Sequence, residues 1–127
     1  MRSNISIFLA EDDDDDASLF KEAVTELVSD VNLVILSNGE QLMRQLETNE
    51  QLPDIIFLDL NMPVKNGLDC LKEIKSSSLW KSIKVVVLST TSDDIQIKKC
   101  YSLGADVFVT KPPSYDKLKL HLKSCLL

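Results

Sequence analysis

Five short apolar runs, separated by segments of helical spacing, set the pattern of this chain. Aliphatic and β-branched residues fill the runs almost without interruption; they are Ile5–Ala10, Val31–Leu36, Ile55–Leu58, Ile83–Leu88 and Val107–Thr110. Continuous apolar runs of this length are typical of strands that are buried on both faces of a parallel sheet. Each run is therefore predicted to be one strand of a single parallel sheet.

The segments between the runs place apolar residues at the three- and four-residue spacing of amphipathic helices. Those predicted to face the core are Ala17, Phe20, Val24, Leu27 and Val28 in the first segment, Leu42, Met43 and Leu46 in the second, and Leu68, Leu71 and Ile74 in the third. Asn38 is a favourable N-cap for the second helix. Ser92, Asp93 and Asp94 are typical of a helix start, and Gly104 is suited to end that fourth helix in a left-handed conformation.

The C-terminal segment fits two structures. Residues 117–123 read KLKLHLK, and strict alternation of this kind is typical of a strand. The same segment also has one apolar helical face, made of Leu118, Leu122 and Cys125. We favour a helix that begins near Ser114 and continues through Leu127, because strands and helices alternate throughout the preceding chain. Leu120 then lies off the main apolar face and is expected to be exposed.

The alternation of five strands and five helices predicts an α/β fold, with one parallel sheet covered by helices on both faces. The 127 residues contain no internal repeat and no linker, so one domain spanning 1–127 is expected. Hydrophobic residues make up 44% of the chain, which is the composition of an ordinary globular protein. No apolar stretch approaches the roughly 20 residues of a membrane-spanning helix.

Charge and cysteine content narrow the function further. The net charge is −6 and the basic residues are scattered, which argues against nucleic-acid binding through a positive patch. Cys70, Cys100 and Cys125 are widely spaced and show no CxxC pattern typical of metal sites. We expect them to be buried, reduced thiols, and the protein to be cytoplasmic.

Polar residues follow four of the five strands at the point where each strand ends. Glu11 and Asp12 follow the first, Asp59 the third, Ser89 the fourth and Lys111 the fifth. Because the carboxyl ends of parallel strands meet at one edge of the sheet, these side chains are predicted to share a pocket. Three carboxylates, a hydroxyl and an ammonium suit a divalent cation together with a phosphoryl group.

The predicted carboxylates need a counter-charge. Two unit charges 4 Å apart repel by about 4 kcal/mol at an effective dielectric constant of ~20. Mg²⁺, with Mn²⁺ as an alternative, is the expected cofactor because it binds carboxylates, waters and phosphate oxygens. Asp59 is either a simple strand-end cap or a nucleophile that forms an aspartyl phosphate. The acids at Asp14–Asp16 are expected to form a solvated first helical turn, favoured by the helix dipole.

The chain resembles, over essentially its whole length, the receiver domain of two-component response regulators, in a stand-alone, single-domain form. The motifs that carry the resemblance are FLAEDDDDDA (Phe8–Ala17), IIFLDLNMPVKNG (Ile55–Gly67), VVVLSTTSDD (Val85–Asp94) and GADVFVTKPPSY (Gly104–Tyr115). The resemblance implies a flavodoxin-like, doubly wound (βα)5 sandwich whose five parallel strands lie in the order 2-1-3-4-5.

The resemblance also implies roles for individual residues. Asp59 corresponds to the phosphoacceptor. Glu11 and Asp12 correspond to the acidic pair that binds the metal together with Asp59, and the backbone carbonyl of Asn61 completes the protein ligands. Lys111 is implied to pair with a phosphoryl oxygen, and the step from Lys111 to Pro112 is often a cis bond in the family.

Two further positions resemble the family's conformational switch. Ser89 corresponds to the hydroxyl that senses the phosphoryl group, and Phe108 to the aromatic side chain that turns inward on activation. Simpler interpretations remain open, since Ser89 also suits a helix cap and Phe108 also suits the core.

The sequence departs from the family pattern at four places. The acidic run is longer than usual, which leaves Asp13 as an alternative metal ligand. Ser89 replaces the commoner threonine, Lys84 stands where a proline often opens the fourth strand, and Pro113 stands where a hydrophobic residue is usual. We therefore expect a looser entry to the fourth strand and an uncertain start of the last helix.

The expected function is a signalling switch rather than an enzyme, although the domain assists its own phosphorylation and dephosphorylation. A sensor histidine kinase or a phosphotransfer protein is the expected phosphodonor. Since the chain stops with the last helix, the output is expected to be a protein contact. The face made by the fourth helix, the fifth strand and the fifth helix is the candidate for a downstream partner or a homodimer, with Ile97, Tyr101 and Leu120 as contact residues.

Four other functions fit less well. A phosphorylation-independent scaffold has no need for a charge cluster at Asp12, Asp59 and Lys111. A phosphohydrolase of the DxD type lacks its second acid, because Asn61 occupies that position. A flavodoxin binding FMN needs a phosphate loop where this chain has acids. A phosphohistidine carrier is disfavoured because His121, the one histidine, lies in the C-terminal segment.

Overall fold

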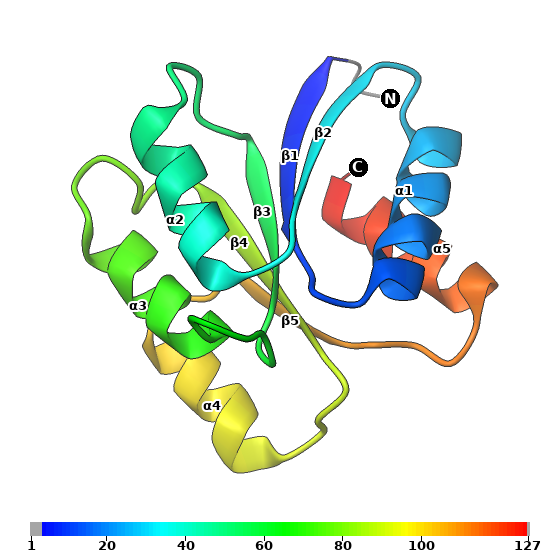
Figure 1. Ribbon diagram of the computed structural model, residues 1–127. Helices are drawn as coiled ribbons and strands as arrows, with labels where there is room; N and C mark the ends of the chain where they lie inside the picture. The colour runs from blue at the N-terminus through cyan, green and yellow to red at the C-terminus, as the bar shows by residue number, and fades with distance from the viewer. Residues whose placement is uncertain (1–3, 127) are drawn as a thin grey trace.

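The computed structural model describes residues 4–126, and within this range five parallel strands form one sheet in the order β2-β1-β3-β4-β5 (Figure 1). The strands are β1 (Ile5–Ala10), β2 (Val31–Leu36), β3 (Ile55–Asp59), β4 (Lys84–Ser89) and β5 (Val107–Thr110). The helices are α1 (Asp14–Leu27), α2 (Gly39–Thr48), α3 (Gly67–Ser76), α4 (Asp94–Ser102) and α5 (Tyr115–Leu126). The predicted doubly wound fold and strand order are confirmed.

Helices cover both faces of the sheet, as Figure 1 shows, with α1 and α5 on one face and α2, α3 and α4 on the other. Each layer encloses its own group of buried apolar side chains. On the first face Phe20 of α1 packs edge-to-face against Phe57 of β3, with ring centroids 4.9 Å apart. Because β1, β3 and β4 bury side chains on both faces, their sequences are apolar almost throughout, as expected for central parallel strands.

Side chains just before the helices satisfy backbone N–H groups that have no partner inside the helix. Asn38 accepts a hydrogen bond from the Gln41 N–H at 2.8 Å, which confirms its predicted role as the N-cap of α2. Asp13 caps α1 in the same way, and Ser114 accepts from the Lys117 N–H at 3.3 Å at the start of α5.

The structure corrects several predicted boundaries. β3 includes Asp59 and β4 runs from Lys84 to Ser89, one residue later than predicted, because Asp59 pairs with Leu88 across the two strands. The looser entry to β4 predicted at Lys84 is not seen, because the Lys84 ammonium donates a hydrogen bond to the Cys125 carbonyl at 3.0 Å. Cys125 is only half-buried, unlike the predicted buried thiol, whereas Cys70 and Cys100 are buried.

The KLKLHLK segment is helical, so the predicted helix is confirmed and its alternation is not that of a strand. Leu122 is buried in this helix and Leu120 is 67% exposed, as predicted. The predicted end at Leu127 lies outside the described residues. Within residues 4–126 every peptide bond is trans, that between Lys111 and Pro112 included. No helix in the described part of the chain is long and apolar enough to cross a membrane.

Gly67 and Gly104 occupy positions that exclude a side chain. Gly104 has a φ of +108°, which is the left-handed geometry predicted for the end of α4. A Cβ added to Gly67 would lie 2.3 Å from the Asp59 carbonyl oxygen and 2.7 Å from the Leu60 Cα. The start of α3 therefore packs directly against the end of β3, and this contact fixes the position of the loop that follows Asp59.

Candidate functional site

The predicted acids do come together at the carboxyl edge of the sheet. Among the described residues, Glu11, Asp12 and Asp59 each offer a carboxylate oxygen, and these oxygens all lie within 4.8 Å of one another. Glu11 and Asp12 directly follow β1, and Asp59 ends the adjacent β3. The cluster thus exists because two neighbouring parallel strands end side by side.

The three carboxylates differ in their exposure to solvent. Glu11 is 4% exposed and Asp59 is 5% exposed, whereas Asp12 is exposed. Burial raises the pKa of the Glu11 carboxyl to about 7; the hydrogen bond from Lys111 opposes this rise and the neighbouring Asp59 adds to it. The exposed Asp12 gives the cluster an open side toward solvent.

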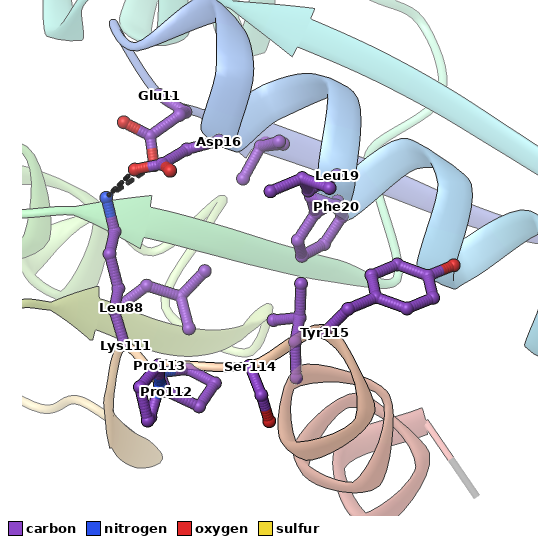
Figure 2. Close-up of a pocket in the computed structure, with 12 residues that line it drawn as sticks. Glu11, Asp16, Leu19, Phe20, Leu88, Lys111, Pro112, Pro113, Ser114 and Tyr115 are labelled. Atoms are coloured by element: carbon purple, nitrogen blue, oxygen red, sulfur yellow. Dashed lines mark hydrogen bonds and ion pairs between the residues drawn. The ribbon is translucent and has the colours of Figure 1, made fainter.

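Lys111 extends from the end of β5 into this cluster. Its Nζ lies 2.7 Å from Glu11 Oε1 and 3.0 Å from Asp16 Oδ2 (Figure 2). The distance from Nζ to Asp59 Oδ2 is 3.7 Å. Burial alone would lower the pKa of the ammonium, but the hydrogen bonds to Glu11 and Asp16 outweigh burial and raise the pKa above its ordinary value. Lys111 is therefore a permanent cation that offsets part of the negative charge.

Ser89 lies at the end of β4 and is fully buried. Its hydroxyl oxygen accepts a hydrogen bond from the Thr91 N–H at 3.2 Å, and its carbonyl accepts one from the Lys111 N–H at 2.7 Å. The second of these bonds ties the ends of β4 and β5 together beside the acids. The predicted set of Glu11, Asp59, Ser89 and Lys111 thus comes from four adjacent strand ends.

The donor set fits a hard divalent cation. Carboxylate oxygens within a few ångström of one another, one of them open to solvent, are what such an ion binds. Asn61 follows Asp59 by two residues, and its N–H donates to Asp59 Oδ1 at 3.4 Å. Asp13, the alternative ligand in the sequence, instead directs its carboxylate to the Asp16 N–H at the start of α1.

Comparison with known proteins decides the family. Residues 7–123 match the family described as the response regulator receiver domain. The chain belongs to this family. It is 36% identical over 110 residues to response regulator Rcp1 of Synechocystis sp., an alignment that covers 83% of this chain and 75% of Rcp1. The receiver domain is a signalling switch of two-component phosphorelays, so the expected signalling class is confirmed.

Solved receiver structures have the same fold. The crystal structure of the phosphorylated cyanobacterial phytochrome response regulator RcpA is similar, with a TM-score of 0.90 and 35% identity over 96% of this chain and 91% of RcpA. The Mn²⁺-bound form of Rcp1 is similar, with a TM-score of 0.87 and 32% identity over 95% of this chain and 91% of the Rcp1 chain.

Two features of this receiver domain were missed by the sequence prediction. Asp16 was expected to be solvated, but it is half-buried and pairs with Lys111. Ile95 is 78% exposed on α4, whereas Ile97, the predicted surface residue, is half-buried. Both differences depend on how far each helix is rotated about its own axis, and the sequence pattern sets that rotation only roughly.

A cavity of about 120 Å³ lies beside the Lys111 side chain, between α1 and the connection from β5 to α5 (Figure 2). Its wall is mostly apolar and includes Leu9, Leu19, Phe20, Leu88, Pro112 and Leu118. Glu11, Asp16 and Lys111 form its polar side. The stem of Lys111 therefore has free volume on one side instead of close packing.

Proposed function

We propose that this receiver domain is switched by phosphorylation of Asp59. The proposal rests on one observation above the others: a buried carboxylate at the end of a central strand faces both an acidic cluster and the Lys111 ammonium. The similarity to the phosphorylated response regulator RcpA supports it. A sensor histidine kinase or a phosphotransfer protein is the proposed donor.

The transfer is a displacement at phosphorus. An Asp59 carboxylate oxygen forms the new P–O bond while the P–N bond to the donor's histidine breaks, and the imidazole leaves with the electron pair of that bond. Catalysis of such a step is mainly positioning and charge neutralisation. Lys111 supplies a permanent positive charge for the oxygens of the transferred group, and Ser89 supplies a hydroxyl.

Mg²⁺ is the proposed cofactor, held by the carboxylates of Glu11, Asp12 and Asp59 and by the Asn61 carbonyl. When bound, the ion neutralises the charge that the phosphoryl group adds. The Mn²⁺-bound form of the similar Rcp1 supports the binding of a divalent cation. The buried Glu11, with its raised pKa, sits where an added positive charge favours the ionised carboxylate.

The proposed output is a change of the surface formed by α4, β5 and α5. Ser89 moves toward the phosphoryl group, Phe108 turns inward, and the face that carries Ile95, Tyr101 and Leu120 is altered. A shift of the population from 1:99 to 99:1 needs about 5.5 kcal/mol of differential interaction. New charge-assisted hydrogen bonds to the phosphoryl oxygens are of this scale. The output partner is a second protein or a second copy of this chain.

The test is phosphorylation by acetyl phosphate and Mg²⁺, comparing the wild type with Asp59→Asn by intact mass. We expect a labile adduct of one phosphoryl group on the wild type and none on the variant. An adduct that persists in Asp59→Asn would place the phosphoryl group elsewhere. If neither acetyl phosphate nor a panel of phosphorylated histidine donors modifies the wild type, the phosphorylation proposal is wrong and a scaffold role takes its place.

A further inference from the structure

Asp16 is the acid of the Asp12–Asp16 run that contacts Lys111 through a hydrogen bond. Asp13 caps α1, and Asp14 and Asp15 are exposed on its first turn. Asp16 is half-buried, and its Oδ2 accepts a hydrogen bond from Lys111 Nζ at 3.0 Å. Figure 2 shows Glu11 and Asp16 together at the tip of the Lys111 side chain. The α1 turn thus delivers a carboxylate to the candidate site from outside the strand ends.

The Lys111 ammonium is closer to these two acids than to the candidate phosphoacceptor. Its distances to Glu11 and Asp16 are hydrogen-bonding distances, whereas Asp59 at 3.7 Å is beyond that range. The Lys111 stem lines the cavity of about 120 Å³, so close packing does not hold it on that side. The ion pairs therefore decide where the ammonium lies.

We infer that Asp16 is a positioning residue that holds the Lys111 ammonium back from Asp59 in the unphosphorylated protein and thereby slows phosphorylation. The inference rests on the proposed function of Asp59. A phosphoryl group on Asp59 brings new acceptor oxygens and negative charge, and Lys111 must turn from Asp16 to reach them. The Asp16–Lys111 ion pair stabilises only the unphosphorylated arrangement, so it opposes the movement of the ammonium toward Asp59.

Asp16→Asn tests the inference, and Asp15→Asn is a matched control. Both variants remove one negative charge from the same helical turn, but Asp15 is exposed and Asp16 contacts Lys111. With acetyl phosphate and Mg²⁺, we expect the rate constant for modification of Asp16→Asn to rise roughly two- to fivefold, the scale of a partly exposed ion pair. Asp15→Asn should stay within roughly 1.5-fold of the wild type because solvent and salt screen its charge.

The Lys111→Met background separates positioning from a general charge effect. There, Asp16→Asn should change the rate by less than roughly 1.5-fold, since its effect acts through the ammonium. Equal acceleration by Asp15→Asn and Asp16→Asn, or an undiminished effect in Lys111→Met, would overturn the inference. Thermal unfolding of each variant checks that the fold is kept.

A second readout needs neither metal nor phosphodonor. The NMR signals of the Lys111 side-chain Cε and Nζ should shift in Asp16→Asn and remain unchanged in Asp15→Asn. Unchanged signals in Asp16→Asn would show that the ion pair does not place the ammonium, and would overturn the inference. A wild type that no phosphodonor modifies overturns the proposed function and this inference with it, whereas a wild type modified as fast as Asp16→Asn overturns the inference alone.

Discussion

The Tyr101 hydroxyl accepts a hydrogen bond from the backbone N–H of Phe108 at 3.0 Å. Tyr101 lies on α4, and Phe108 lies on β5, the last strand of the sheet. β5 pairs with β4 on one side only, so a tyrosine from the neighbouring helix satisfies an N–H at an edge of the sheet. This bond ties α4 to the residue proposed as the switch aromatic.

Tyr101→Phe should loosen this connection without removing the ring. We expect a loss of stability of about 0.5–1.5 kcal/mol, toward the low end because Tyr101 is 47% exposed. The amide hydrogen of Phe108 should exchange faster with solvent, whereas amides of the central β3 should be unaffected. Unchanged exchange at Phe108 in an otherwise folded variant would show that the hydroxyl does not protect this edge.

Gly67→Ala should destabilise the protein, because the new Cβ would meet the backbone of Asp59 and Leu60 at 2.3 Å and 2.7 Å. Overpacking against backbone costs about 1–3 kcal/mol, since the neighbouring atoms cannot rotate away. Urea unfolding should show a lower midpoint for Gly67→Ala. Ser18→Ala, at an exposed position on α1, is the control and should leave the midpoint close to that of the wild type. Equal midpoints for both variants would contradict the close approach of α3 to β3.

Ionisation of the buried Cys70 thiol should lower the stability of the folded protein at alkaline pH. Burial raises the pKa of its thiol from 9.0 to about 11, so the folded state keeps the proton while the unfolded chain loses it. The stability that the protonated thiol contributes is fully present below pH 9 and is lost as the pH rises toward 11. The loss in the free energy of unfolding is at most about 2–3 kcal/mol.

The pH dependence of the urea midpoint between pH 8 and pH 10.5 measures this contribution. The wild type should lose stability more steeply than Cys70→Ala, which keeps every other titrating group. Parallel curves for the two proteins would exclude Cys70 as the cause.

Removal of the divalent cation should lower the melting temperature of the wild type. A ligand that binds only the folded state at 100 times its dissociation constant stabilises it by about 2.7 kcal/mol. Asp12→Asn should lose most of this Mg²⁺-dependent rise. Without metal it should be no less stable than the wild type, because one like charge has left the cluster. Asp14→Asn, an exposed acid on α1, is the control. A full Mg²⁺ response in Asp12→Asn would remove Asp12 from the proposed ligands.

Leu120→Glu should weaken association through the α4-β5-α5 face while phosphorylation of Asp59 proceeds at its normal rate. Leu120 is 67% exposed, and a charge there opposes burial in an interface. Leu79→Glu is a matched control, because Leu79 is 72% exposed and lies between α3 and β4. Light scattering of the phosphorylated protein and pulldown of its partner measure the association. If both variants associate as the wild type does, Leu120 is not part of the interface.

The sequence alone determined the strands, the order of elements and the acids, hydroxyl and lysine of the candidate site. The physical reason is that a parallel sheet places the carboxyl ends of all its strands at one edge. Glu11, Asp59, Ser89 and Lys111 each follow or end an apolar run, so finding the runs was enough to place them together.

The tertiary structure alone decided which side chains meet between elements. Asp16 and Lys111 pair because α1 is rotated so that its third residue faces the end of β5, and Tyr101 reaches Phe108 because α4 packs beside the sheet edge. The rotation of α4 about its own axis exposes Ile95 and half-buries Ile97. Apolar spacing tells which side of a helix faces the core, but a contact at hydrogen-bonding distance depends on the position and rotation of both elements. Those are set by packing of the whole domain.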